Sequence, residues 1–115
     1  MTHYNKLTPE KRASERIELA GYNVDFIDIH LSSSVIITDI SKEGLRMTRV
    51  PKKLAYKETP TKITISGNFL SGSQNLTIIP CWRKRNALYW DVGFYIHSVP
   101  EFWKRFFSII KIRSR

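Results

Sequence analysis

Hydrophobic and polar residues alternate through the middle of the chain, in short segments separated by small polar residues. Alternation of this kind, rich in Val, Ile and Thr, is typical of strands that bury one face. Leu45 and Met47 restart the alternation after a polar turn that ends at Gly44, where a glycine permits a positive φ. The pattern predicts further strands at residues 23–31, 35–38, 62–69, 75–83 and 88–97. Several short strands at this spacing predict a mainly β fold, a small antiparallel β-barrel.

Three segments interrupt the strand pattern. Residues 50–60 are rich in Lys and contain two prolines, which predicts a loop or a broken strand. Residues 83–86 are interpreted as the turn between the last two strands. Near the N-terminus, Thr8 and Pro9 are the residue types of a helix cap and a first helical position, so a short helix is predicted over residues 9–19.

The C-terminal segment is predicted to be an amphipathic helix. Ser98 and Glu101 stand three residues apart, as in a capping box, and Pro100 falls in the first turn. Large apolar residues then form a wide apolar side: Phe102, Trp103, Phe106, Phe107, Ile109 and Ile110. We interpret this side as a lid packed on the barrel, with a helix docked on a membrane surface or a partner as the alternative. Residues 113–115 are interpreted as a basic tail.

Composition indicates one small domain. A chain of 115 residues can bury a single modest core, and its 42% of hydrophobic residues argues against wholesale disorder. No apolar run approaches the roughly 20 residues of a membrane span, and the N-terminus lacks the apolar stretch of a signal peptide. We therefore expect a cytoplasmic protein without a membrane span. The single cysteine, Cys81, is expected to be a buried small hydrophobic residue.

Neither a metal site nor a catalytic site is predicted. His3, His30 and His97 are isolated in sequence, and none pairs with a cysteine or a carboxylate at a metal-ligand spacing. The sequence also lacks a nucleophile with its base, a paired-carboxylate site and a phosphate-binding glycine loop. We therefore expect a protein that is not an enzyme and needs no cofactor.

The charge of the chain favours an anionic partner. The net charge is +9, and it is unevenly distributed. Residues 1–31 hold four Lys or Arg against five Asp or Glu, which leaves 15 against 5 for the rest of the chain. A solvated basic face that only keeps the protein soluble is the alternative.

Two short motifs carry the candidate chemistry. Arg12 and Arg16 form an RxxxR pattern, and after 22 intervening residues Asp39, Ser41 and Gly44 form a DxSxxG pattern. Arginine can bind phosphate oxygens or one edge of guanine through two parallel hydrogen bonds, while a carboxylate and a hydroxyl can accept from the N–H donors of the other guanine edge. Together the two motifs favour a ligand that contains phosphates and guanines.

At these motifs the chain resembles the PilZ domain family of bacterial receptors for cyclic di-GMP. The resemblance covers residues 11–112, because the strand ending at Trp82 and the strand led by Gly93 are similar to late strands of the family. It implies a six-stranded, split antiparallel barrel with a C-terminal helix, after an N-terminal arm at residues 1–10. Ile96 departs from the family, which often has an aromatic residue there. In the family the RxxxR segment is often a mobile arm, the alternative to the N-terminal helix.

The resemblance also implies a ligand role for each motif residue. Arg12 and Arg16 would bind the phosphates of cyclic di-GMP. Asp39 would accept hydrogen bonds from the guanine N1–H and exocyclic amine. Ser41 would add a hydroxyl contact, and Gly44 would shape the turn.

Two further positions match the family pattern. Trp82 lies where family members can pack an aromatic ring beside a guanine, although a plain core tryptophan is the alternative. Lys11 directly precedes the first arginine, where a basic residue implies two stacked ligand molecules per chain. Lysine lacks the planar fork that arginine would offer there.

The function implied is that of a cyclic di-GMP sensor that passes ligand binding to a partner protein by changing conformation. The resemblance suggests motility, pilus, exopolysaccharide or transcription machinery as the partner. One alternative is a PilZ-like scaffold that docks partners without a ligand. Another is a basic barrel that binds single-stranded nucleic acid through its aromatic residues, namely Trp82, Tyr89, Trp90 and Phe94. Nucleic acid is the less favoured partner because it leaves the DxSxxG motif unexplained.

Overall fold

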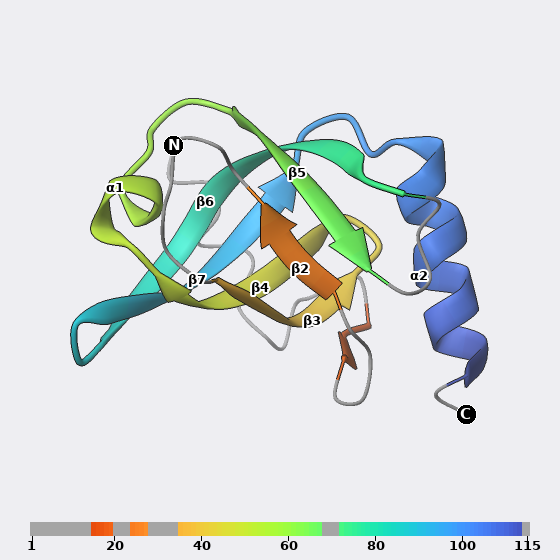
Figure 1. The fold of residues 1–115 in the computed structure, drawn as a ribbon, viewed down its shortest axis with the longest axis horizontal. Helices are drawn as coiled ribbons and strands as arrows, with labels where there is room; N and C mark the ends of the chain where they lie inside the picture. The colour runs from red at the N-terminus through yellow and green to blue at the C-terminus, as the bar shows by residue number, and fades with distance from the viewer. Residues whose placement is uncertain (1–14, 20–23, 28–34, 68–71, 114–115) are drawn as a thin grey trace.

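The computed structural model describes residues 15–19, 24–27, 35–67 and 72–113. Within these ranges the chain forms seven strands and two helices, arranged as in Figure 1. The elements are β1 (Ile17–Glu18), β2 (Val24–Ile27), β3 (Ile36–Ser41), β4 (Gly44–Val50), α1 (Lys52–Ala55), β5 (Thr61–Gly67), β6 (Gln74–Asn86), β7 (Tyr89–Ile96) and α2 (Glu101–Arg113).

All the strand pairings are antiparallel, and six of the strands close into a ring. The order is β3, β2, β5, β6, β7 and β4, and β4 pairs with β3 again. The seam between β2 and β3 is narrow, with Asp25 opposite Ile36 as the pair in the described residues. The short strand β1 pairs with the C-terminal half of β3, where Ile17 lies opposite Ile40. The predicted fold, a small antiparallel barrel with a C-terminal helix, is confirmed.

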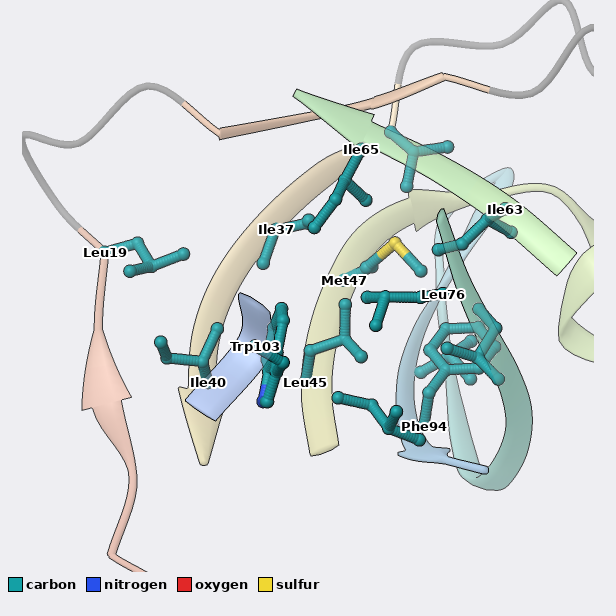
Figure 2. Packing of buried hydrophobic residues seen from close by; sticks show 14 of the residues in the cluster. Leu19, Ile37, Ile40, Leu45, Met47, Ile63, Ile65, Leu76, Phe94 and Trp103 are labelled. Atoms are coloured by element: carbon teal, nitrogen blue, oxygen red, sulfur yellow. The ribbon is translucent and has the colours of Figure 1, made fainter. Parts of the chain in front are cut away.

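Apolar side chains from alternate strand positions fill the inside of the curled sheet (Figure 2). Ile40, Met47, Ile65 and Ile78 come from four different strands, and each is fully buried. Because successive side chains of a strand point to opposite faces, the strands contribute mostly every second residue to this core, and the spacing changes to three at the register shifts of β3 and β4. The period-of-two pattern of the sequence is thereby explained.

Helix α2 packs against the sheet, at the end of the molecule opposite α1 (Figure 1). Its buried side consists of Trp103, Phe106, Phe107 and Ile110, which join the core cluster. The indole Nε1–H of Trp103 also donates a hydrogen bond to the backbone oxygen of Ser41, at 3.0 Å. The helix is therefore a lid that closes the core and contacts the DxSxxG turn.

The predicted boundaries of α2 need a correction. The carbonyl oxygen of Pro100 accepts the first backbone hydrogen bonds, from Trp103 and Lys104, so the helix begins at Glu101. Ser98 lies before the helix with a φ of 57°. The capping box predicted from Ser98 and Glu101 is wrong, because the bend that brings the chain onto the sheet occupies that position.

Three other segments also differ from expectation. The predicted loop at residues 50–60 contains the short helix α1, which buries Leu54 and Ala55. Strand β6 continues through the predicted turn at residues 83–86, and Ala87 and Leu88 form the turn instead. The predicted N-terminal helix does not extend over residues 15–19, where the chain is extended and Ile17 is buried. In α1 and in residues 15–19, apolar side chains are buried against the sheet, and this burial overrides the local propensity.

No helix within the described part of the chain has both the length and the apolar character needed to cross a membrane.

Candidate functional site

A row of directly paired residues crosses four neighbouring strands. Asp39 of β3 pairs with Arg46 of β4, which pairs with Gly93 of β7, which in turn pairs with Trp82 of β6. We call these four residues the Asp39 row. Residues directly opposite in antiparallel strands place their side chains on the same face, only about 5 Å apart. The row therefore brings the acidic motif and the predicted ligand-stacking ring to one surface.

The Asp39 row lies on the outer face of the sheet. The chain neighbours of its members are buried in the core: Ile40, Leu45, Val92 and Phe94. Since side chains alternate between the two faces of a strand, the row must point away from this core. A ligand approaching from solvent meets this face first.

Asp39 is a buried carboxylate held by two arginines. It is only 5% exposed, and Arg46 Nε lies 2.9 Å from its Oδ2 while Arg16 Nη1 lies 3.6 Å from its Oδ1. Thr38 locks the geometry, because its Oγ1 accepts from Arg46 Nε at 3.2 Å and donates to the backbone oxygen of Arg46 at 3.2 Å. A buried charge is tolerated only when it is paired and hydrogen-bonded. The arginines therefore compensate the charge of Asp39 and fix its orientation.

Arg16 reaches this carboxylate from the N-terminal strand. Strand β1 places Glu18 opposite Asp39, so Arg16, two residues earlier, approaches the same face. The adjacent Glu15 connects this strand to α2, since its Oε1 lies 3.1 Å from Lys111 Nζ. The second arginine of RxxxR and the aspartate of DxSxxG are thus in contact.

The DxSxxG turn is a two-residue hairpin in which Ser41 pairs with Gly44. The Ser41 hydroxyl donates to the backbone oxygen of Gly44 at 3.5 Å, a long contact. The positive φ expected at Gly44 is not found. The glycine is required for another reason, because a Cβ there would lie 2.5 Å from the backbone oxygen of Phe94. Close packing of β4 on β7, rather than backbone conformation, explains this residue.

A bulge in β6 turns Trp82 outward. The register with β7 shifts between Pro80, opposite Phe94, and Trp82, opposite Gly93. Cys81 sits at the shift, with its Sγ 3.3 Å from the backbone oxygen of Gly93. The indole of Trp82 lies directly on Gly93, where a Cβ would come within 2.2 Å of Nε1. Trp82 is therefore a half-buried outer-face ring, and the core alternative is wrong.

Burial favours the protonated form of the Cys81 thiol. The thiol is half-buried, and burial raises its pKa from 9.0 to about 11, against a smaller lowering by the charge of Arg16. A protonated thiol is a poor nucleophile and a poor metal ligand. The residue acts as a small packing group at the bulge, as expected.

Two of the predicted ligand residues, Arg16 and Asp39, are in contact, and Trp82 lies on the same face of the sheet, three strands away along the Asp39 row. Ser41 and Gly44 lie at the adjacent turn, two or more residues along the same hairpin. The remaining two predicted residues, Lys11 and Arg12, lie outside the described residues.

Sequence reasoning missed Arg46 and Gly93. Arg46 could have been found from the hairpin itself, because a two-residue turn between Ser41 and Gly44 places Arg46 directly opposite Asp39. Gly93 lies under the Trp82 indole, and the sequence around Gly93 does not indicate this contact, since Trp82 comes from a different strand.

One alternative site loses support. The nucleic-acid interpretation relied in part on Phe94, which is 2% exposed and belongs to the core. Within the described ranges, no group of three His, Cys, Asp or Glu residues is placed to hold a metal ion.

Known proteins give no further guide. No protein-family model matches the chain, and no curated protein matches it. Function must therefore be inferred from the residues of the Asp39 row and its neighbours.

Proposed function

We propose that the chain is a cyclic di-GMP sensor, with the ligand bound on the outer face at the Asp39 row. The observation that carries the proposal is the contact between Arg16 and Asp39, on the same face of the sheet as the outward ring of Trp82. Residues from three distant segments lie on this face, and they offer a cation, an acceptor and a flat ring. A guanine dinucleotide needs all three of these groups.

Arg16 is suited to bind a phosphate. Its guanidinium is 3.6 Å from Asp39 Oδ1, a looser contact than the 2.9 Å of Arg46 to Oδ2, and its side chain is 32% exposed. It directly precedes strand β1, which is only two residues long. Transfer of Arg16 from the carboxylate to a doubly negative ligand needs little rearrangement, and Arg–phosphate hydrogen bonds are the strong, charge-assisted kind.

Asp39 is suited to read guanine. When Arg16 moves to a phosphate, Oδ1 becomes an acceptor for the guanine N1–H and amine, while Arg46 still holds Oδ2. Adenine presents no matching pair of donors on that edge. The arrangement therefore favours guanine over adenine.

Trp82 is suited to stack on a base. Its indole lies on the bare backbone of Gly93 and is half-buried. Stacking of a nucleobase on an aromatic side chain contributes about 1–3 kcal/mol. The ring lies two strands away from Arg46 along the row, so one ligand can span from the carboxylate to the indole.

Ligand binding can reach α2 by two contacts. Glu15, next to Arg16, pairs with Lys111 at 3.1 Å, and Trp103 donates to the backbone oxygen of Ser41 at 3.0 Å. Movement of Arg16 would change the ion pair between Glu15 and Lys111, and tightening of the DxSxxG turn would change the hydrogen bond from Trp103 to Ser41. We propose that the solvent side of α2, where Ile112 is 72% exposed, is the surface that a partner protein senses.

Calorimetric titration with cyclic di-GMP tests the proposal. The wild-type protein is expected to bind with micromolar affinity or better, and Arg16→Ala and Asp39→Ala are each expected to weaken binding about tenfold or more. Arg105→Ala, which removes an exposed arginine of α2, is the control and should bind like wild type. The titration end point also counts the ligands per chain.

Cyclic di-AMP provides the matched ligand control, because it has the same phosphates and different base edges. Equal binding of both dinucleotides would contradict guanine recognition by Asp39. No heat and no thermal shift with cyclic di-GMP would contradict the sensor function and leave the docking-scaffold alternative.

A further inference from the structure

A second cationic surface lies at the end of the molecule opposite α2 (Figure 1). There the guanidinium carbon of Arg83 lies 3.8 Å from the centre of the Tyr56 ring, and that of Arg85 lies 5.7 Å from the centre of the Trp90 ring. The two rings meet edge to face at 5.3 Å. We call these four residues the arginine–aromatic cluster.

The cluster exists because the β6–β7 hairpin extends beyond the core. Arg83 pairs with Val92 and Arg85 pairs with Trp90, so both arginines are on the face that points inward elsewhere in the barrel. Past Val92 that face reaches the edge of the core, where Trp90 packs, and Tyr56, directly after α1, covers it. The arginines are stacked on rings instead of being buried or left loose in solvent.

Both guanidinium groups are held in place without a carboxylate. Arg85 Nε donates to the backbone oxygen of Ala87 at 2.9 Å, which fixes its side chain across the turn. Among the residues that the structure describes, neither Arg83 nor Arg85 has an acidic group within ion-pair distance. A guanidinium stacked on a ring keeps the N–H donors at its edges available, already oriented for an anion.

The two segments that build this end of the molecule are rich in cations. Residues 49–57 hold four Lys or Arg and residues 82–90 hold three, and the neighbouring acidic residues are Glu58 and Asp91, which pairs with Lys84 across the hairpin. One of them, Lys52, also places its Nζ 5.6 Å from the Tyr56 ring. The partner must therefore be an anion, and one long enough to meet several cations.

We propose that the arginine–aromatic cluster binds single-stranded nucleic acid. Arg83 and Arg85 are two residues apart on an extended β-strand, so they are separated by roughly 7 Å. This separation is comparable with the distance between successive phosphates of an extended nucleic-acid strand. A fixed guanidinium can hold a phosphate bidentately or stack on a base. Tyr89 and Leu88, which are 42% and 82% exposed at the hairpin tip, add surface for base contact.

An anionic bilayer is the other polyanion to consider. Its attraction for a basic surface depends on the number of nearby charges and would be served equally by lysines in any orientation. The ordering of arginine planes by aromatic rings matters more for a ligand that reads orientation than for a bilayer. The observed stacking therefore favours nucleic acid.

The proposed surface is distinct from the Asp39 row. Side chains alternate along β6, so Arg83 points to the face opposite that of Trp82. Cyclic di-GMP at the Asp39 row should not displace nucleic acid from the cluster, and the two functions can be tested separately.

The test is fluorescence anisotropy with a labelled oligothymidylate of about 12 nucleotides, measured between about 50 and 200 mM salt. The double variant Arg83→Ala/Arg85→Ala is expected to weaken binding about tenfold or more. It should also reduce the slope of log affinity against log salt by about 1.4, or 0.7 for each lost phosphate contact. Lys62→Ala/Arg105→Ala, which removes two exposed cations of β5 and α2, should change the affinity much less.

A second variant separates orientation from charge. Arg83→Lys/Arg85→Lys keeps the charge but loses the planar fork, so it should retain the salt slope while losing affinity. The proposal is overturned if wild type binds no oligonucleotide at low salt, if the lysine variant binds like wild type, or if both alanine pairs weaken binding equally. It is also overturned if cyclic di-GMP displaces the oligonucleotide, or if the cluster is needed only for binding phosphatidylserine vesicles.

Discussion

Replacement of Arg46 by Met is expected to lower the free energy of unfolding by about 2 kcal/mol. The change leaves a carboxylate that is 5% exposed without the cation at 2.9 Å, while the methylene stem of the side chain is kept. Breaking a buried ion pair costs roughly 3–5 kcal/mol. The Arg46 side chain is 38% exposed and Arg16 stays 3.6 Å from Asp39, so solvent and the second arginine reduce this cost. For a domain of this size the expected loss corresponds to a Tm lower by roughly 6–10 °C.

A double-mutant cycle isolates the contribution of this pair. Asp39→Asn, Arg46→Met and the combined variant are compared with wild type by urea denaturation, followed by tryptophan fluorescence. The combined variant has no unpaired buried charge, so it should be more stable than the sum of the single changes predicts, by about 1 kcal/mol or more. Effects that add to within about 0.3–0.5 kcal/mol would show that the two charges are not coupled, and the reasoning would then be refuted.

Three further outcomes follow from the structure of the site. Gly44→Ala should cost about 1–3 kcal/mol in urea denaturation, because its Cβ would press on the Phe94 backbone oxygen at 2.5 Å; an unchanged midpoint would contradict this close packing. Gly93→Ala should displace the indole of Trp82, changing its fluorescence and weakening cyclic di-GMP binding while a cooperative unfolding transition is retained. Cys81 should react slowly with iodoacetamide at neutral pH and faster as pH rises toward its pKa of about 11, because only the thiolate attacks; fast alkylation of the native protein at pH 7 would show that the thiol is not protected by burial.

The predictability of the site differs from residue to residue. The hairpin could be read locally: Asp39, Ser41 and Gly44 were expected at a turn between strands, and that is where they lie. The role of Gly44 was wrongly assigned to backbone conformation, because the atom it must avoid belongs to Phe94, 50 residues later in the chain. Non-local contacts of this kind have no signal in the local pattern.

Strand β6 shows the same limit on a larger scale. The charged segment 83–86 has the composition of a turn, yet it continues the strand for its full length. Pairing with β7 and stacking of Arg83 on Tyr56 stabilise an extended conformation that local propensity does not favour. Propensity is a weak prior where pairing and packing oppose it.

The sequence alone determined the alternation of buried and exposed residues, and with it the mainly β fold, the amphipathic lid and the DxSxxG hairpin. These features depend on neighbours within a few residues, for which the periods of strand and helix are sufficient. The tertiary structure decided which strands lie side by side, and so set Arg46, Gly93 and Trp82 in one row with Asp39. It also decided the direction of Trp82, because the bulge at Cys81 exchanges the two faces of β6. Closure of the ring couples residues far apart in the chain, and that coupling is established only when the whole core packs.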